Sequence, residues 1–316
     1  MINKKSRIFL TGHNGMVGSS ILRVLQKKNF SNIITVDRYK LNLENRSKVF
    51  NFLKRKKIDA VIHCAAYVGG IKANNFFKAD FITKNLQIQN NIIIGSFESG
   101  IKKLIFLGSS CIYPKECKQP IKEEYFLTGP LEMTNRPYAV AKIAGVEMCR
   151  SFNYQYKTDY ISLMPSNLFG PNDNYDKESS HFIPALIRKI YEAKKNSEKD
   201  ITIWGTGEPK REITYVDDVA RAVIFLLNKN NLNYLINVGS GYEKKIRDFA
   251  KIIAKEIGFK GKIICNNNSR LDGTPRKIVS TKLIRSYGWR PKFDINKSIK
   301  LTIKDFVKYK NKYLKS

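Results

Sequence analysis

The sequence predicts an α/β fold, a doubly wound parallel (Rossmann) sheet with a smaller interleaved α/β domain, and three observations support the prediction. Short apolar runs alternate with helical patterns from Arg7 to about Met164. A glycine-rich segment, Gly12 to Gly18, lies between the first apolar run and the first helical pattern. A later apolar run, 104–107, stops at small polar residues, which is typical of a buried parallel strand.

The first predicted strand, Arg7 to Leu10, leads into glycines with the spacing Gly-x-x-Gly-x-x-Gly and then into a predicted helix, Ser19 to Lys28. Gly12, Gly15 and Gly18 lack side chains where the backbone turns tightly, approaches a pyrophosphate or packs a helix on a strand. The helix start offers free N–H groups and the positive end of its dipole to phosphates. This context favours dinucleotide binding over an ordinary turn.

The second predicted strand, Asn32 to Val36, leads to the position that contacts the adenosine ribose in dinucleotide-binding folds. An acid there, about 20 residues past the glycines, binds the ribose hydroxyls of NAD, whereas an arginine accommodates the 2′-phosphate of NADP. Asp37 and Arg38 therefore point to different cofactors. Lys40 adds positive charge, so the sequence favours NADPH, and tighter binding of NADH would contradict this prediction.

Strands and helices continue to alternate after this point. Residues 47–56 are predicted as a helix, 59–66 as a strand, 80–99 as a long helix and 104–107 as a strand. Strands that alternate with helices form parallel sheets through crossover connections. We therefore expect strand 104–107 to lie inside the sheet, with the residues that follow it at the carboxyl edge.

Ser109 and Ser110 follow that strand, and a helix is predicted from Ala139 to Glu147. Tyr138 and Lys142 lie four residues apart at the helix start, so they share one face. A lysine ammonium favours the phenolate of a neighbouring tyrosine, so Tyr138 can exchange a proton with a substrate oxygen near neutral pH. Ser109 or Ser110 can hydrogen-bond the same oxygen. A Tyr-x-x-x-Lys pair is weak evidence by itself, and its position after this strand and the glycine segment gives it weight.

The second half of the chain is predicted to contribute to both domains. Predicted strands cover 160–164, 201–205 and 235–239, and predicted helices cover 184–194, 219–227, a segment from Lys245, and the C-terminus. Strand 235–239 is expected to rejoin the main sheet, so the smaller domain is interleaved. The sequence thus predicts a dinucleotide-binding Rossmann domain at 1–170 plus 211–240 and a substrate domain at 171–210 plus 241–316.

The composition restricts the class of protein. With 57 Lys and Arg against 27 Asp and Glu, the chain of 316 residues carries a formal charge of +30, which a nucleic-acid binder would explain. The lysines are spread along the whole chain, so a solvated surface explains them better and no nucleic-acid partner is predicted. The five cysteines show no metal-site spacing, and no apolar run reaches transmembrane length. We therefore expect no metal, no membrane and a reducing, cytoplasmic location.

Three segments resemble a known family. Residues 108–114 (Gly-Ser-Ser-Cys-Ile-Tyr-Pro), 137–145 (Pro-Tyr-Ala-Val-Ala-Lys-Ile-Ala-Gly) and 165–171 (Pro-Ser-Asn-Leu-Phe-Gly-Pro) are similar to the GDP-L-fucose synthase family of the extended short-chain dehydrogenase/reductases. Segments 68–75, 180–186 and 272–277 match too, so the resemblance covers nearly the whole chain. It implies conversion of GDP-4-keto-6-deoxy-D-mannose to GDP-L-fucose, by epimerisation at C3 and C5 and then reduction at C4 with NADPH.

The resemblance implies catalytic roles for five side chains. Tyr138 would protonate the C4 oxygen, Lys142 would hold the nicotinamide ribose and lower the pKa of the phenol, and Ser109 would hydrogen-bond the same oxygen. The 4-keto group acidifies the protons on C3 and C5. By the resemblance, Cys111 would be the base and His181 the acid that delivers a proton to the other face. A cysteine suits this role where a cationic surrounding favours the thiolate.

The resemblance also implies binding residues. For the cofactor they are Gly12, Gly15, Met16, Val17, Gly18, Arg38, Leu107, Gly108, Ser109, Ser110, Lys142, Pro165, Asn167, Leu168 and His181. For the GDP part of the substrate they are Lys189, Trp204, Arg211 and Asp272. Asn14 departs from the family pattern, which has an arginine there that helps to hold the 2′-phosphate, and Lys189 stands where arginine is common. Family habit implies a homodimer through helices 80–99 and 139–156.

Other functions stay open on the sequence alone. The same chemistry on another GDP-4-keto-6-deoxy sugar, such as a heptose, would differ only around the sugar. A sugar-nucleotide 4,6-dehydratase would want an acid just after the serine of the strand, where Cys111 and Ile112 stand, and a 4-epimerase would leave Cys111 without a task. A nucleic-acid binder or a catalytically dead interaction module would not need Ser109, Tyr138 and Lys142 together.

Overall fold

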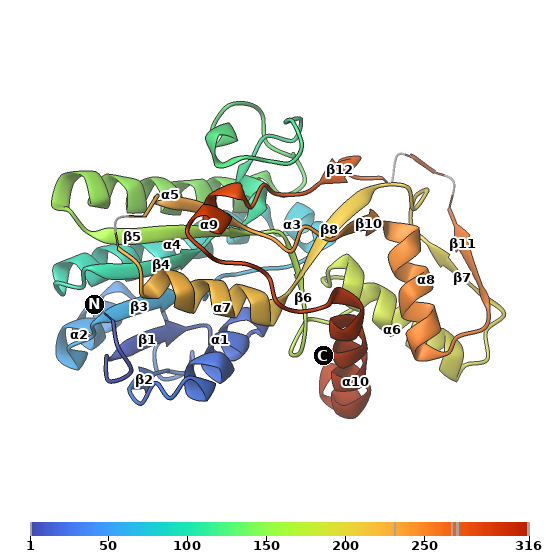
Figure 1. Cartoon of the computed structure of the whole chain (residues 1–316), viewed down its shortest axis with the longest axis horizontal. Helices are drawn as coiled ribbons and strands as arrows, with labels where there is room; N and C mark the ends of the chain where they lie inside the picture. The colour runs from blue at the N-terminus through green and yellow to red at the C-terminus, as the bar shows by residue number, and fades with distance from the viewer. Residues whose placement is uncertain (1, 231, 267, 270–271, 315–316) are drawn as a thin grey trace.

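The structure, a computed structural model, describes residues 2–230, 232–266, 268–269 and 272–314. Its larger lobe is built on one six-stranded sheet in the order β2-β1-β3-β4-β5-β9 (Figure 1). The strands are β1 (Ile8–Thr11), β2 (Ile33–Ile34), β3 (Ala60–His63), β4 (Lys103–Leu107), β5 (Asp159–Pro165) and β9 (Leu235–Val238). Every neighbouring pair runs parallel, and β9 returns to the sheet beside β5 as expected. The predicted doubly wound α/β fold is confirmed.

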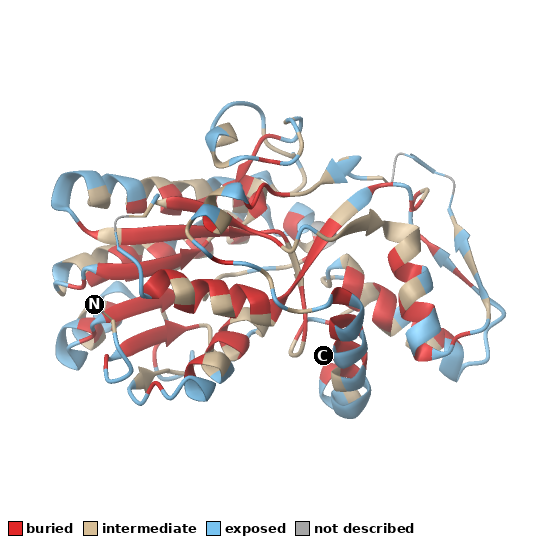
Figure 2. Ribbon diagram, viewed as in Figure 1, coloured by how far each residue is buried: buried red, intermediate tan, exposed pale blue. Residues whose placement is uncertain are grey.

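The central strands form where the sequence is apolar on both faces of the sheet. Every residue of β1, β3 and β4 is buried, and Figure 2 shows these strands as the core of the larger lobe. A strand buried on both sides needs helices above and below it, and the crossover connections of a parallel sheet supply them. The carboxyl ends of the strands are left at one edge, where their loops are free to form a site.

Helices cover both faces of this sheet. One face carries α1 (Met16–Lys27) and α7 (Val216–Leu227), and the other carries α2 (Arg46–Lys56), α4 (Lys78–Glu98) and α5 (Arg136–Tyr156). α4 and α5 pack side by side (Figure 1). Each of these helices begins slightly earlier than predicted, because its first turn precedes the apolar pattern. No helix in the described part of the chain is long and apolar enough to span a membrane.

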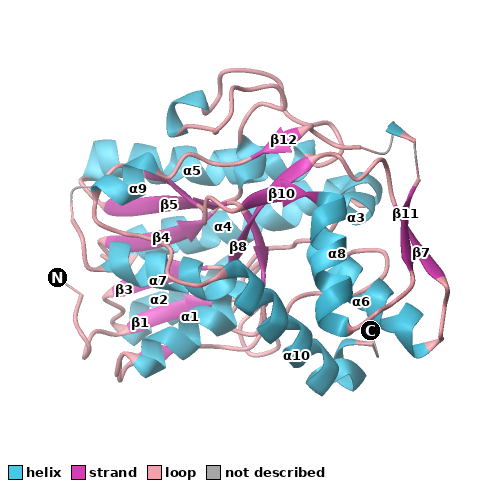
Figure 3. Ribbon diagram, turned by 45° about the vertical axis from the view of Figure 1, so that its right-hand side comes forward, coloured by secondary structure: helices cyan, strands magenta, loops and turns pink. Residues whose placement is uncertain are grey.

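The smaller lobe holds a mixed sheet around β8 (Lys210–Tyr215), which pairs with β6 (Asn167–Phe169), β10 (Glu243–Lys245) and β12 (Arg276–Lys277). The strands β7 (Asp200–Ile203) and β11 (Lys262–Cys265) pair separately. A second apolar core holds this lobe together. The lobe's helices, seen in Figure 3, are α6 (Phe182–Lys195), α8 (Ile246–Ile257) and α10 (Ile295–Tyr313). The sequence does not predict β6, β10, β12 or the short helix α3 (Ile71–Phe76), because such short segments show no clear period. It also does not predict β8, whose first three residues are charged.

The chain crosses between the lobes repeatedly. β6 and β8 belong to the second sheet, α7 and β9 return to the first, and α9 (Lys282–Ser286) packs against β9. The Ser166 and Thr214 hydroxyls, 2.7 Å apart, join the end of β5 to β8. These crossings bring the carboxyl edge of the main sheet against the smaller lobe. The domain boundaries at 170, 211 and 240 stay a prediction.

Candidate active site

The glycine-rich segment forms a tight turn between β1 and α1, at the carboxyl edge of the main sheet. Gly12 has φ +70°, and a Cβ on Gly18 would lie 2.1 Å from the Gly12 carbonyl oxygen, so a side chain fits at neither position. α1 begins after Gly15, and no side chain caps its first N–H groups. This helix start fits the pyrophosphate of a dinucleotide, whose oxygens accept from such N–H groups.

The residues after β2 meet the glycine turn. Asn14 Nδ2 donates to Asp37 Oδ1 at 2.8 Å, and His13 Nε2 lies 3.3 Å from the same oxygen. The hydrogen bond from Asn14 is the largest cause of a lowered pKa of Asp37, and the nearby His13 lowers it further. Arg38 extends to the surface and donates to Glu44 Oε1 at 2.9 Å. Both contacts lie at the surface: the partly exposed Asp37 carboxylate has two partners, Asn14 and His13, and Arg38 has one, in an exposed ion pair, which is weak.

The end of β4 places two of the predicted catalytic side chains on one turn. Ser109 precedes the 3₁₀ turn η1 (Ser110–Ile112), and its Oγ accepts from the backbone N–H of Cys111 at 3.3 Å. Both side chains act on the hydroxyl of Tyr138: Ser109 shares a hydrogen bond with it, and Cys111 lies close enough to affect its ionisation. The turn therefore presents Ser109 and Cys111 to the same space beyond the sheet.

Tyr138 and Lys142 lie one turn apart at the start of α5. Lys142 is buried, and its ammonium donates to the carbonyl oxygen of Leu107 at 2.9 Å. The same ammonium lies 5.8 Å from the centre of the Tyr138 ring. The structure thus brings the predicted serine, cysteine, tyrosine and lysine together at the end of β4, from two elements that are separate in the sequence.

The pKa of Tyr138 is raised, which is opposite to the direction expected from the sequence. Loss of water around the hydroxyl is the largest cause, Cys111 adds to it, and the hydrogen bond with Ser109 acts against it. Lys142 does not reverse the effect, because its ammonium is bound to a backbone carbonyl and lies beside the ring. Burial lowers the pKa of Lys142 to about 8. Tyr138 is therefore held as a neutral phenol, the form that donates a proton.

Two further side chains, to which the sequence assigns no role, contact Cys111. Asn135 Nδ2 lies 3.3 Å from Cys111 Sγ, and Lys277 Nζ lies 3.9 Å from it. The ammonium thus places positive charge beside the sulfur. The signal that pointed toward Lys277 is the family match of segment 272–277, which names no function for the lysine. Only the three-dimensional contact shows that it faces the predicted base.

His181 lies in the smaller lobe, directly before the first residue of α6. It keeps exposed surface, yet the protein around its ring lowers its pKa, and the charge of Lys277 lowers it further. The backbone before it is held by Gly70, whose N–H donates to the carbonyl oxygen of Ser179 at 2.6 Å. Lys277 therefore lies near both His181 and Cys111. The two residues predicted for epimerisation come from different lobes, and the same lysine is close to each of them.

Arg211 and Asp272, two of the residues predicted to bind GDP, are neighbours in the smaller lobe. Asp272 accepts from the backbone N–H of Thr206 at 2.9 Å and from its hydroxyl at 2.6 Å, and its charge acts on Arg211. Burial lowers the pKa of Arg211, but a guanidinium stays charged in proteins. In the pairing of β12 with β8, Arg211 lies opposite Lys277. Because Lys277 also contacts Cys111, this strand pairing places the predicted GDP-binding residue Arg211 next to the cluster around Cys111.

Lys189 and Trp204, the other two residues predicted to bind GDP, lie on α6 and directly after β7. The Lys189 ammonium donates to the carbonyl oxygen of Thr202, two residues before the tryptophan. Trp204 is 64% exposed, so it is not part of the core of this lobe. An exposed indole at a strand end offers a flat face on which a base can stack.

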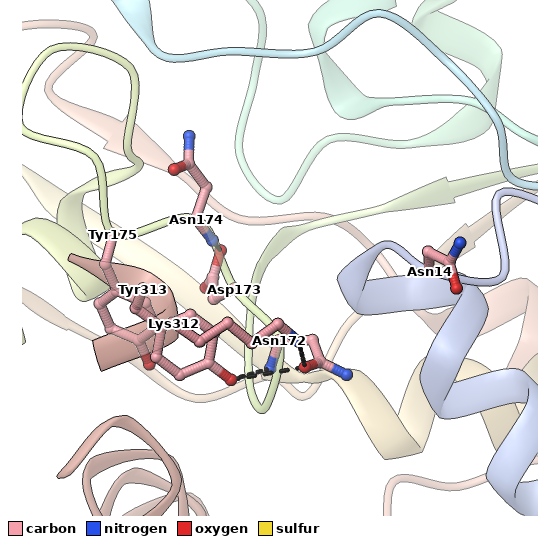
Figure 4. Close-up of a pocket in the computed structure, with 7 residues that line it drawn as sticks. All are labelled: Asn14, Asn172, Asp173, Asn174, Tyr175, Lys312 and Tyr313. Atoms are coloured by element: carbon pink, nitrogen blue, oxygen red, sulfur yellow. Dashed lines mark hydrogen bonds between the residues drawn. The ribbon is translucent and has the colours of Figure 1, made fainter. Parts of the chain in front are cut away.

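A pocket of about 200 Å³ lies between the glycine turn and the end of α10 (Figure 4). Asn172 joins its two sides: Nδ2 donates to Ser19 Oγ of α1 at 3.1 Å, and its backbone N–H donates to the Tyr313 hydroxyl at 3.2 Å. Lys312 Nζ lies 3.4 Å from Asn172 Oδ1. Asn14 lines this pocket and Tyr138 does not, so the pocket belongs to the side of the glycine turn and not to the cluster around Cys111.

Comparison with known proteins agrees with this geometry. The NAD dependent epimerase/dehydratase family matches residues 8–239. A GDP-L-fucose synthase of Sinorhizobium fredii is 48% identical, over 95% of this chain and 95% of its own. A GDP-L-fucose synthetase of Naegleria fowleri bound to NADP superimposes with a TM-score of 0.90, at 27% identity over 98% and 95% of the two chains. MlghC of Campylobacter jejuni, a GDP-mannoheptose C4 reductase with NADP bound, gives 0.88, at 33% identity over 97% and 100%.

These matches extend through both lobes and are not confined to the dinucleotide-binding part. Similarity over the whole length, with the same fold from end to end, indicates common descent and not a shared motif. The chain therefore belongs to the NAD dependent epimerase/dehydratase family, and within that family it groups with the GDP-L-fucose synthases.

Proposed function

We propose that this chain is a GDP-L-fucose synthase, which converts GDP-4-keto-6-deoxy-D-mannose to GDP-L-fucose with NADPH. The observation that carries the proposal is the cluster of Cys111, His181 and Lys277 beside Tyr138, which offers groups for proton removal and return next to a phenol that can donate. The Sinorhizobium fredii relative and the Naegleria fowleri structure, which bear this activity in their names, support it.

Inversion at C3 and C5 needs a base, a stabilised enolate and an acid. We assign the base to Cys111, whose thiolate takes the proton from carbon and is favoured by the Lys277 ammonium 3.9 Å away. Ser109 and Tyr138 hydrogen-bond the C4 oxygen, where negative charge develops. His181 then gives a proton to the opposite face, which inverts the centre. Burial and then Lys277 lower the pKa of His181, so the imidazolium that donates is the minor form near neutral pH and a stronger acid than an ordinary one.

In the reduction, NADPH supplies the hydride that reaches C4. Tyr138, held as a neutral phenol, gives its proton to the C4 oxygen, so the ketone becomes an alcohol and the tyrosine becomes a phenolate. Lys142 holds the nicotinamide ribose and stabilises that phenolate, since its ammonium lies at the Tyr138 ring. Ser109 keeps the oxygen in place through both stages.

The structural basis for NADPH is the contrast between Asp37 and Arg38. An NAD-type acid accepts from the ribose hydroxyls, and Asp37 would have to give up its exposed contacts with Asn14 and His13 to do so. Arg38 can exchange its exposed partner for a 2′-phosphate at little cost, because an exposed ion pair contributes little. The two neighbours with bound NADP support the same cofactor.

Replacing Arg38 by alanine is expected to raise the Kd for NADPH about tenfold and to leave the Kd for NADH unchanged, because only the 2′-phosphate meets the guanidinium. Fluorescence titration with each cofactor measures both constants. Arg46→Ala removes the same charge from α2 and serves as the control. Equal weakening of both cofactors by Arg38→Ala would contradict the assignment.

The kcat/KM for NADPH is expected to fall above about pH 8, since burial lowers the pKa of Lys142 to about 8 and its ammonium is present only below that value. His63, Cys64 and Tyr138, which surround Lys142, do not titrate there: burial lowers the pKa of His63 to about 3 and raises that of Cys64 to about 12, and Tyr138 stays protonated. Lys142→Arg keeps its charge, so its remaining activity should not fall in this range. A fall at the same pH in that variant would assign the titration to another group.

The direct test incubates the protein with GDP-4-keto-6-deoxy-D-mannose and NADPH, follows the loss of NADPH absorbance, and identifies the product by NMR. We expect GDP-L-fucose. The Campylobacter jejuni neighbour supports a second candidate, the same chemistry on a GDP-keto-heptose, so that sugar is assayed in parallel. A higher kcat/KM for the heptose would overturn the fucose assignment, and no NADPH consumption with either sugar would overturn both.

We further propose that the protein acts as a homodimer in the cytoplasm. α4 and α5 form a layer on the outside of the larger lobe, and α5 exposes Val140 and Tyr154, the latter by 83%. Two copies facing each other through these helices would cover this surface. The free cysteines suit a reducing compartment. Light scattering tests the dimer, and a monomer mass at assay concentration would contradict it.

A further inference from the structure

The segment 276–280 carries Lys277 to the reaction centre, and side chains from distant parts of the chain bind its backbone. Only Arg276 and Lys277 pair with β8, as the strand β12. So short a strand leaves the N–H and C=O groups that follow it to other partners, because buried backbone groups are almost always hydrogen-bonded. Those partners decide where the lysine stands.

Glu212, on β8, binds the segment from one side. Its fully buried carboxylate accepts from the backbone N–H of Val279 through Oε2 at 3.0 Å and from that of Gly241 through Oε1 at 2.7 Å. The packing is close, since a Cβ on Gly239 would lie 2.3 Å from Oε1. One carboxylate thus joins the segment of Lys277 to the loop that follows β9 of the main sheet.

Gln119, in the loop between η1 and α5, binds the segment from the other side. Its Oε1 accepts from the backbone N–H of Ile278 at 2.9 Å. Ile121 continues the contact as a short parallel bridge: its N–H donates to the Ile278 carbonyl at 2.8 Å, and its carbonyl accepts from the Ser280 N–H at 2.7 Å. Successive N–H groups of an extended chain point in opposite directions, so the segment is held from both sides directly after its lysine.

We propose that Glu212 is a positioning residue for the epimerisation: together with Gln119 it fixes the backbone after Lys277, so that the ammonium stays 3.9 Å from Cys111 Sγ. The inference rests on the proposed role of Cys111 as the base. A lysine side chain is long and flexible, and it keeps one position only where its backbone is fixed. The attraction between ammonium and thiolate weakens as their distance grows, so a small shift of the segment weakens the base.

Glu212 acts through the backbone and not by contact with the reacting groups. Burial raises the pKa of Glu212 to about 7, and the hydrogen bonds from Val279 and Gly241 act against it. Of the charged groups that face the carboxylate, Glu243 raises the pKa and Arg285 lowers it. The groups that face Cys111 and Lys277 are different ones. They are Tyr138, His181 and Cys117. Loss of the Glu212 charge would by itself favour a thiolate, so slower alkylation of Cys111 after a change at Glu212 indicates movement of segment 276–280.

The test compares Glu212→Gln with Lys277→Met by a reaction that needs no sugar. Iodoacetamide alkylates thiolates, and peptide mass spectrometry follows Cys111 separately from the other cysteines. We expect the pH midpoint of Cys111 alkylation to rise by about one unit in Lys277→Met, which removes the charge, and by about half a unit in Glu212→Gln. The amide keeps the shape of the side chain but replaces one acceptor by a donor.

The same variants are then assayed with the sugar nucleotide. Deuterium exchange at C3 and C5 is expected to slow about tenfold in Glu212→Gln, because the base is displaced. Reduction of a ketone that has already been epimerised should proceed at the wild-type rate, since Tyr138, Ser109 and Lys142 are untouched. A general loss of structure would lower both rates together, so the split between them distinguishes positioning from instability.

Asp218→Asn is the matched control. Asp218, on α7, is equally buried, and its carboxylate accepts from the backbone N–H groups of Lys292 and Phe293 at 2.8 and 3.2 Å. It holds another segment by the same chemistry, so Asp218→Asn should lower thermal stability and leave the alkylation midpoint at the wild-type value. Gln119→Leu releases the segment of Lys277 from the other side, and the midpoint should rise there even if Glu212→Gln folds poorly.

A wild-type alkylation midpoint in both Glu212→Gln and Gln119→Leu would overturn the proposal, as would an equal shift in Asp218→Asn. The proposed function fails by a different result, namely no exchange of the C3 and C5 protons of GDP-4-keto-6-deoxy-D-mannose in the wild-type protein. In that case the alkylation midpoints still decide whether Glu212 positions Lys277 against the thiol.

Discussion

Replacing Tyr138 by phenylalanine is expected to lower kcat for the C4 reduction by about 10²- to 10⁴-fold, the range for the loss of a positioned proton donor. The ring keeps its edge-to-face contact with Phe81, at 6.2 Å between centroids, so the helix start should stay in place. The proton for the C4 oxygen is gone, however. Exchange at C3 and C5 should continue at a moderately reduced rate, because Ser109 still hydrogen-bonds the enolate oxygen. NADPH absorbance measures reduction, and deuterium incorporation measures exchange.

Tyr154→Phe on the same helix is the control, because this tyrosine is 83% exposed and far along α5 from the site. It should reduce and exchange at wild-type rates. Normal turnover in Tyr138→Phe would remove the phenol from the mechanism. Equal loss of exchange and reduction would instead assign Tyr138 to substrate binding, since only a donor used in the second stage leaves the first stage intact.

Replacing Cys111 by serine is expected to slow exchange at C3 and C5 by about 10²- to 10⁴-fold. A serine hydroxyl is a much weaker acid than a cysteine thiol, so serine cannot replace the base that we propose beside the Lys277 ammonium. Reduction of a ketone that has already been epimerised should survive, because Tyr138 and Lys142 are intact. Deuterium incorporation into the substrate, followed by NMR without NADPH, measures the first stage alone.

Cys117→Ser is the matched control in the same loop. Burial raises the pKa of Cys117, and the charge of Lys277 only partly opposes this, so its thiol is a poor candidate for a base. Exchange should be unaffected. If Cys111→Ser kept full exchange while Cys117→Ser lost it, the base would have to be reassigned to the second cysteine.

Much of the catalytic centre follows from local spacing. Tyr138 and Lys142 share a helix face because they are four residues apart, and Ser109 and Cys111 share a turn because they follow one buried strand. The direction of the Tyr138 pKa does not follow from spacing. It depends on how much water the surrounding protein removes and on the Leu107 carbonyl that binds the lysine. Sequence spacing therefore predicts which catalytic side chains lie close together, whereas burial decides whether the Tyr138 hydroxyl is ionised.

The smaller lobe shows the opposite balance. Its strands β6, β10 and β12 are too short for a period to appear, and β8 begins with charged residues, Lys210, Arg211 and Glu212. These strands pair with partners far along the chain. The sequence accordingly identifies segment 272–277 without a function for Lys277. The structure suggests a function for this lysine, because Lys277 pairs with Arg211 across β8 and β12 and so lies between the predicted GDP residues and the proposed base.

Residue order and spacing predicted the Rossmann fold and the dinucleotide turn at Gly12 to Gly18. Together with the family resemblance they also predicted the catalytic residues at the end of β4. Tertiary packing was needed to show that Cys111 meets Lys277, 166 residues away in the sequence, and that Glu212 holds that lysine's backbone. The reason is physical. Helix and turn geometry is set by adjacent residues, whereas the distance between two charges and the water around a phenol depend on how remote segments pack.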